Sequence, residues 1–213
     1  MSRYNATLKY SYMKTLIRIP LEADLDQLQR LTALQAAFAQ VCNALAPMVQ
    51  STRCWNRVAL HHMAYRSLRE QFPEMGSQMV CNAIYSVSRA SRQIYQHPQS
   101  AFNIAKLGDG PLPLLQFEPN CPVYFDRHTL SIKGHQLSMY TLDGRMRFDL
   151  DVAPEVQAAF AEKKLREMVL TIAPSGGFEF AMTLEDARSD EIDESDVAGD
   201  EPVTGYVVVE ASA

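Results

Sequence analysis

Hydrophobic side chains recur at steps of three and four along the first half of the chain, which is the spacing of an amphipathic helix. The pattern predicts three helices joined by short turns, over residues 21–46, 54–70 and 77–97. The first should end before Pro47, because a proline inside a helix removes a backbone hydrogen bond. Ser77 follows a turn and is predicted to cap the third helix. Helices linked this closely pack as a bundle, so we expect a compact helical unit over residues 21–97.

Short β-rich runs separated by turn residues take over in the second half of the chain. They cover residues 122–126, 129–133, 136–140, 145–150, 168–172 and 178–184. Lys133-Gly134 and Asp143-Gly144 are turn dipeptides of the kind that join neighbouring strands. A short helix is expected over residues 154–166. Strands of this length and spacing are typical of a small barrel or curled sheet.

The opening residues alternate as a strand that ends at Pro20, with an irregularity near Lys14. We expect this strand to pair with the later ones, which makes the helices an insertion between strands. The predicted fold is therefore α+β. It consists of a small antiparallel β-barrel of residues 1–20 and 98–184, with a three-helix bundle inserted after the first strand.

The end of the chain has a different composition. Residues 185–203 are acidic and poor in aromatic side chains, so they are expected to form a disordered linker. An apolar run at Tyr206–Val209 predicts a strand within a final segment, residues 204–213. No partner strand follows it in the sequence.

Charge is distributed unevenly along the 213 residues, although the net charge is only −5. Residues 1–100 carry eleven Lys and Arg against five Asp and Glu, whereas residues 185–213 carry one against ten. A basic front half could face a polyanion even though the whole chain is acidic. A solvated basic surface is the commoner explanation of such a balance.

Composition narrows the class of protein. Hydrophobic residues make up 47% of the chain, which fits a folded domain with a core. The longest apolar runs are too short to span a membrane, and the N-terminus lacks the apolar segment of a secretory signal. The four cysteines have wide, irregular spacings that favour free thiols over disulfides. These features predict a cytoplasmic protein with no membrane partner.

No complete catalytic or metal site is visible in the sequence. His61 and His62 are adjacent, so on a helix they point about 100° apart and cannot share one metal ion. A catalytic set of Cys121, Asp126 and His128 is conceivable but has no supporting motif. The glycines are isolated and form no phosphate-binding loop. We therefore predict a protein that is not an enzyme and has no metal or cofactor.

Basic and aromatic residues suggest another chemistry. Arg53, Trp55 and Arg57 open the second predicted helix, and Arg89 and Arg92 lie one turn apart on the third. Guanidinium groups contact phosphates, and an indole ring can stack on a base. The competing interpretation is that Trp55 packs under its helix and the arginines are solvated, and composition alone favours it.

The order of elements resembles the N-terminal half of the TnpB family, transposon-encoded RNA-guided nucleases related to type V CRISPR effectors. The similar segments are Thr7–Tyr10, Leu31–Ala33, Asn43–Leu45, Leu60–Arg69, Phe72-Pro73, Ser77–Ile84 and Val123–Phe148. The resemblance implies a wedge-like β-barrel with a helical recognition insertion. In that family this half holds a guide RNA and recognises a short DNA motif beside the target.

In the family, DNA cleavage belongs to a RuvC-like domain that follows this half. Residues 206–213 look like a remnant of its first strand, with Glu210 where the family has a catalytic Asp. One carboxylate cannot support hydrolysis by two metal ions, so the resemblance implies a binding module without its nuclease. It also implies that the starts of the second and third helices read the DNA motif, through Trp55, Ser77, Gln78, Cys81 and Asn82.

The sequence thus predicts a noncatalytic nucleic-acid-binding protein. Its expected partners are a structured guide-type RNA and duplex DNA, and the candidates for a protein partner are a separate nuclease, another protein subunit or a second copy of the chain. The alternative is a protein–protein interaction subunit, or a self-associating adaptor, that docks through its helical stripe and the strand at residues 206–209.

Overall fold

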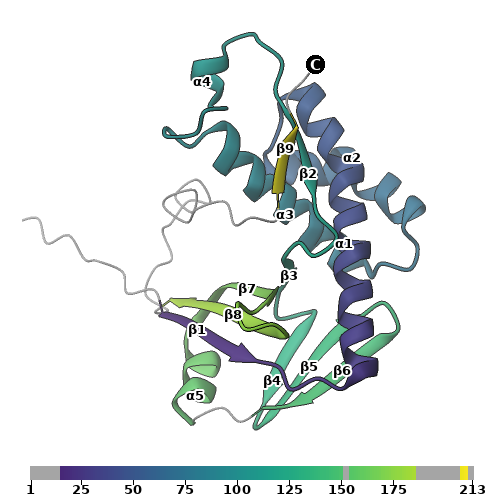
Figure 1. Ribbon diagram of the computed structural model, residues 1–213, viewed down its shortest axis with the longest axis vertical. Coiled ribbons are helices and arrows are strands. Elements are labelled where there is room, and N and C mark those ends of the chain that lie inside the picture. The colour runs from purple at the N-terminus through teal and green to yellow at the C-terminus, as the bar shows by residue number, and fades with distance from the viewer. Residues whose placement is uncertain (1–14, 151–153, 186–206, 211–213) are drawn as a thin grey trace, which may run out of the picture.

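The computed structural model describes residues 15–150, 154–185 and 207–210. It is an α+β protein whose strands pair antiparallel throughout the described sheets, as the sequence predicted for the fold class. In Figure 1 the long helix α1 (Leu25–Thr52) extends along most of the molecule, with helices at one end and most strands at the other. Residues 1–14 and most of the predicted acidic linker lie outside the described residues.

Helix α1 begins with a reciprocal cap. The backbone N–H of Gln27 donates to Asp24 Oδ1 at 2.8 Å, and the N–H of Asp24 donates to Gln27 Oε1 at 3.0 Å. The predicted end before Pro47 is wrong, because α1 continues through the proline to Thr52. Ala46 and Val49 are buried on either side of it, so tertiary packing outweighs the lost hydrogen bond.

Helices α2 (Arg57–Gln71) and α3 (Ser77–Tyr95) pack against each other and against α1. Asn56 caps α2, and its Oδ1 accepts from the Ala59 N–H at 3.0 Å. The predicted capping role of Ser77 is wrong. Gly76 occupies the N-cap position without a side-chain bond, and Ser77 is the first residue of α3.

The main sheet has the strand order β1-β8-β7-β3. Its strands are β1 (Thr15–Pro20), β3 (Val123–Phe125), β7 (Lys164–Ile172) and β8 (Phe178–Glu185). The pairing of β1 with β8 confirms that the opening strand joins late strands. Helices α1 to α3 are therefore inserted between strands of one sheet. The β7–β8 hairpin is also as predicted.

A second sheet is a meander of β4 (Leu130–Lys133), β5 (Gln136–Thr141) and β6 (Gly144–Asp149). Both predicted turns are confirmed: Gly134 and Gly144 have φ of 58° and 92°, a conformation that favours glycine.

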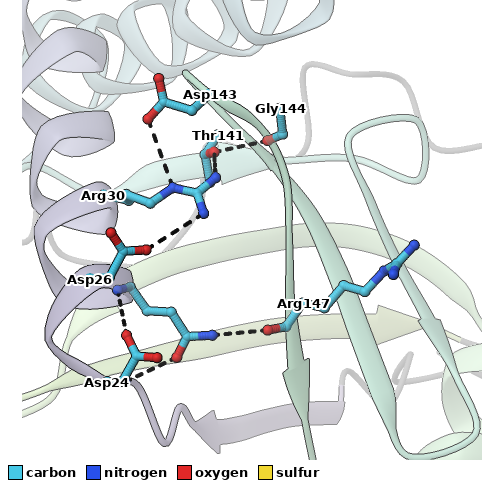
Figure 2. A network of polar contacts seen from close by, with 8 residues as sticks. Asp24, Asp26, Arg30, Thr141, Asp143, Gly144 and Arg147 are labelled. Atoms are coloured by element: carbon cyan, nitrogen blue, oxygen red, sulfur yellow. Dashed lines mark hydrogen bonds and ion pairs between the residues drawn. The ribbon is translucent and has the colours of Figure 1, made fainter.

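Arg30 holds this meander against the start of α1 (Figure 2). Its Nη2 donates to Thr141 Oγ1 at 3.0 Å, and its guanidinium lies 3.8–3.9 Å from the carboxylates of Asp143 and Asp26. The Gln27 amide of the helix cap also reaches the meander, donating to the Arg147 carbonyl at 3.1 Å. The helix cap and the meander are thus fixed by one polar network.

The strand predicted near the end of the chain has a partner after all. β9 (Val207–Glu210) pairs antiparallel with β2 (Leu114–Phe117), an element the sequence pattern did not predict. Asn43 of α1 binds both backbone groups of Phe117, accepting from its N–H at 2.7 Å and donating to its carbonyl at 2.9 Å. This sheet is therefore formed by two strands that lie far apart in the sequence.

The described strands form three separate sheets, and none of them closes into the predicted barrel within the residues described. The two remaining helices are short: α4 (Ile104–Leu107) and α5 (Pro154–Glu162), the latter ending before the predicted residue 166. No helix in the described part of the chain has the length and apolarity needed to cross a bilayer.

Candidate nucleic-acid interface

An open cavity of about 320 Å³ lies between the N-terminal halves of α2 and α3. The side chains that line it differ in chemistry: one cation, one imidazole, one amide, one thiol and two aliphatic groups. They are Arg57, Val58 and His61 of α2 and Gln78, Cys81 and Ile84 of α3. Three of the residues predicted from the sequence, Arg57, Gln78 and Cys81, therefore meet at one place.

Stacked cationic and aromatic groups connect the cavity to the main sheet. The Arg57 guanidinium lies 5.3 Å from the centre of the Tyr85 ring. Tyr85 meets Tyr124 of β3 edge to face at 5.4 Å, and the Arg89 guanidinium lies 5.9 Å from the Tyr124 ring centre. This arrangement fixes the α3 surface next to β3 and limits the positions open to Arg57.

Gln78 is held from the sheet side. Its Nε2 donates to Asp126 Oδ2 at 2.6 Å, just beyond the end of β3. The other carboxylate oxygen of Asp126 accepts from the backbone N–H groups of His128 and Thr129, both at 3.0 Å. Because the turn fixes Asp126, the Gln78 amide is oriented at the cavity before any ligand arrives.

Arg89 is engaged inside the protein, which corrects its predicted role as a phosphate contact. Its Nε lies 2.8 Å from Glu167 Oε1, and the two side chains are only 17% and 14% exposed. The Tyr85 hydroxyl donates to the same oxygen at 3.1 Å. Burial, followed by the negative charge of Glu167, raises the pKa of Tyr85 well above its ordinary value. The charge of Arg89 is thus largely balanced within the fold.

Arg53 and Trp55 are also structural, contrary to the prediction that they contact nucleic acid. Arg53 ends α1 with φ of 52° and donates to the carbonyls of Gly108, at 2.8 Å, and of Gly110. Trp55 is 9% exposed and packs against the ring of Tyr95 at 5.4 Å. Little of the indole surface is left to stack on a base, so the packing interpretation of Trp55 is correct.

The remaining predicted contact residues differ in how exposed they are. Asn82 is buried and donates to Thr129 Oγ1 at 3.4 Å, so it joins α3 to the β4 region and cannot read a base edge. Arg92 donates to Ser88 Oγ at 3.3 Å from a half-buried position. Ser77 is exposed at the first position of α3. Of the predicted residues, Arg57, Ser77, Gln78 and Cys81 remain on this surface.

The alternative chemistries find no support in the geometry. Cys121 is buried, and its burial raises the pKa of the thiol to about 12, so a thiolate nucleophile is not formed near neutral pH. Asp126 is committed to its turn and to Gln78. No group of three metal-ligating side chains occurs among the residues that the structure describes.

Sequence reasoning missed Val58, His61, Ile84 and Tyr85. Arg57 and His61 are four residues apart and therefore share one face of α2, a spacing that would have placed His61 beside Arg57 rather than beside His62. The ring of His61 stacks on Tyr65 at 4.6 Å, which keeps the imidazole in place along this face.

Thiol reactivity offers a probe of this surface. Burial raises the pKa of the Cys81 thiol, and the nearby Arg57 opposes this shift only in part. Less thiolate is present at neutral pH, so iodoacetamide should label Cys81 more slowly than a free cysteine, with the rate still rising above pH 9. Peptide mapping by mass spectrometry measures the rate. Cys42 and Cys121, which are fully buried, should stay unlabelled until the protein unfolds; labelling of Cys81 as fast as free cysteine would contradict this geometry.

Comparison with known proteins identifies no family: the chain matches no family model and no curated protein.

Proposed function

We propose that this chain is a noncatalytic nucleic-acid-binding protein that contacts duplex DNA through the starts of α2 and α3. The observation that carries the proposal is the convergence of Arg57, Gln78 and Cys81, from two helices, on one cavity. Arg57 supplies a cation for a phosphate, and Gln78 supplies an amide whose donor and acceptor match an adenine edge.

Charge supports this assignment. Residues 53–100 carry six arginines, two glutamates and no lysine. Arginine binds phosphate through a planar fork with several donors, which distinguishes it from the point charge of lysine. Arg66, with a side chain 94% exposed, adds to the positive surface of α2 although it also contacts Glu70. Ser77 adds an exposed hydroxyl at the start of α3.

The resemblance to the TnpB family extends the proposal to RNA. In this extended proposal, the two larger sheets correspond to the family's wedge-like β region, which holds a guide RNA. Cleavage is supplied by a separate nuclease. The alternative, docking of a partner protein by strand addition at residues 206–209, would use the side of β9 that faces away from β2.

Fluorescence anisotropy with duplex DNA tests the proposal across 50–200 mM salt. Affinity should fall steeply as salt rises, because phosphate contacts release counterions. Arg57→Gln should weaken binding to all sequences and lower the salt slope by about 1. Gln78→Ala should cost about 1–3 kcal/mol of binding, and only for sites carrying the preferred base.

Lys133→Gln is the matched control. It also removes one positive charge, but from the exposed β4–β5 turn of the meander instead of from the start of α2. It should leave DNA affinity within twofold of the parent protein. Absence of binding to duplex DNA and structured RNA, or binding that does not respond to salt, would refute the proposed function.

A further inference from the structure

We propose that the cavity between α2 and α3 binds a single unpaired nucleobase. The inference rests on the proposed function and adds that one base leaves the stack and enters the protein. The six lining residues are Arg57, Val58, His61, Gln78, Cys81 and Ile84.

Size restricts the occupant. A volume of about 320 Å³ lies at the lower end of the range for small-molecule sites, which is about 300–1,000 Å³. This volume suits one ring system with its sugar. A base inside a duplex is covered on both faces by its neighbours, so only an extruded or single-stranded base can enter such a cavity.

The walls suit a flat ring. Val58 and Ile84 offer aliphatic surface, and His61 is held in a stack with Tyr65 at 4.6 Å and an interplanar angle of 18°. The guanidinium of Arg57 lies over Tyr85, which fixes a second planar group at the cavity. Proteins that hold unpaired bases use this combination of aromatic rings, guanidinium planes and apolar contacts.

The polar groups suit the edge of a nucleobase and its phosphate. The Gln78 amide, anchored by Asp126 at 2.6 Å, presents neutral hydrogen-bonding groups of both kinds. Cys81 adds a thiol that burial keeps neutral by raising its pKa. Arg57 is the one permanent cation among the lining residues, a composition that matches a neutral ring joined to a charged phosphate.

Two sources could supply this ligand: a base within a strand and a free nucleotide. Anisotropy should therefore compare three duplexes of one sequence, which are fully paired, bulged by one nucleotide, or bulged by an abasic spacer. The base-containing bulge should bind about tenfold more tightly than the spacer, since stacking of one base is worth about that factor. Free nucleoside monophosphates should compete with the bulge only at much higher concentration.

Val58→Gln tests the cavity itself, because Val58 lines it and is 57% exposed, so a longer side chain without an aromatic ring can fill the opening without entering the core. This variant should bind the two bulged duplexes equally. Met63→Gln is the matched control, since Met63 is 44% exposed on the same helix and lies outside the cavity lining. It should keep the tenfold preference, and thermal melting checks that both variants fold.

The outcomes separate the two proposals. Equal affinity of the parent protein for both bulges, together with salt-dependent binding of the paired duplex, would overturn the nucleobase site and leave the proposed function standing. Loss of the preference in Met63→Gln as well as in Val58→Gln would also overturn the site. Displacement of the bulge by micromolar nucleotide would assign the cavity to a free nucleotide instead, and absence of all binding would refute both proposals.

Discussion

Replacing Arg89 by methionine should lower the free energy of unfolding by about 3–5 kcal/mol at neutral pH. The change keeps an apolar stem of similar length and removes the cation that lies 2.8 Å from Glu167. The Glu167 carboxylate would then remain 14% exposed in a place shaped for an ion pair, beside the hydroxyl of Tyr85. The Glu167 carboxylate loses its nearest cation, which is costly for a charge so little exposed, whereas the intact pair contributes little. Urea unfolding followed by circular dichroism measures the loss.

Two further variants make this result specific to the ion pair. Arg66→Met is the same substitution at an exposed i, i+4 pair with Glu70, and it should cost no more than about 0.5 kcal/mol. The double variant Arg89→Met with Glu167→Met should recover much of the loss, because both charges are gone. If Arg89→Met costs as little as Arg66→Met, the ion pair between Arg89 and Glu167 does not stabilise the packing of α3 against β7.

The same ion pair shows why the candidate site was only partly predictable. Arg57 and Arg89 look alike in the sequence, each an arginine on an amphipathic helix. Arg57 reaches the cavity, whereas Arg89 is matched by a glutamate on β7 that lies far along the chain. Local patterns place a residue on a helix face, but a distant strand decides whether its charge is balanced. The packing of Trp55 could not be read from local pattern for the same reason, since the ring it packs against, Tyr95, is the last residue of α3.

Elements defined by neighbouring residues were predicted well. The β4–β5 and β5–β6 turns depend on Gly134 and Gly144, whose positive φ the dipeptide pattern anticipates. The hairpin of β7 and β8 likewise follows from alternation on both sides of a short turn. Sheet closure is different, because it depends on which edges meet in space, and the predicted barrel is not formed by the described strands.

Pro47 marks the limit of propensity arguments. A proline costs roughly 3 kcal/mol inside an isolated helix, so ending α1 before it was the reasonable expectation. The helix continues because Leu45, Ala46 and Val49 are buried on a face that already packs against the rest of the protein. The extra turn brings the chain to Arg53, whose left-handed conformation and contacts with Gly108 and Gly110 then set the start of α2.

Asn43→Leu should be almost as destabilising as Arg89→Met, at about 2–4 kcal/mol or a melting temperature lower by roughly 5–15 °C. Asn43 is a half-buried polar residue of α1, and its amide serves both backbone groups of Phe117 at 2.7 and 2.9 Å. Leucine keeps the same number of heavy atoms, branched at Cγ, and removes both bonds. Phe117 is 3% exposed, so its N–H and carbonyl would lose these partners without gaining water.

Gln40→Leu is the matched control, because Gln40 is exposed on the same helix and should change stability by no more than about 0.5 kcal/mol. Hydrogen exchange distinguishes a local loss from a general one: in Asn43→Leu the Phe117 amide should exchange much faster, while amides of the β7–β8 hairpin change only as far as global stability does. Equal melting temperatures for the two variants would mean that β2 is held by its pairing with β9 and by apolar packing alone. In that case the two hydrogen bonds of Asn43 would contribute little to holding β2 against α1.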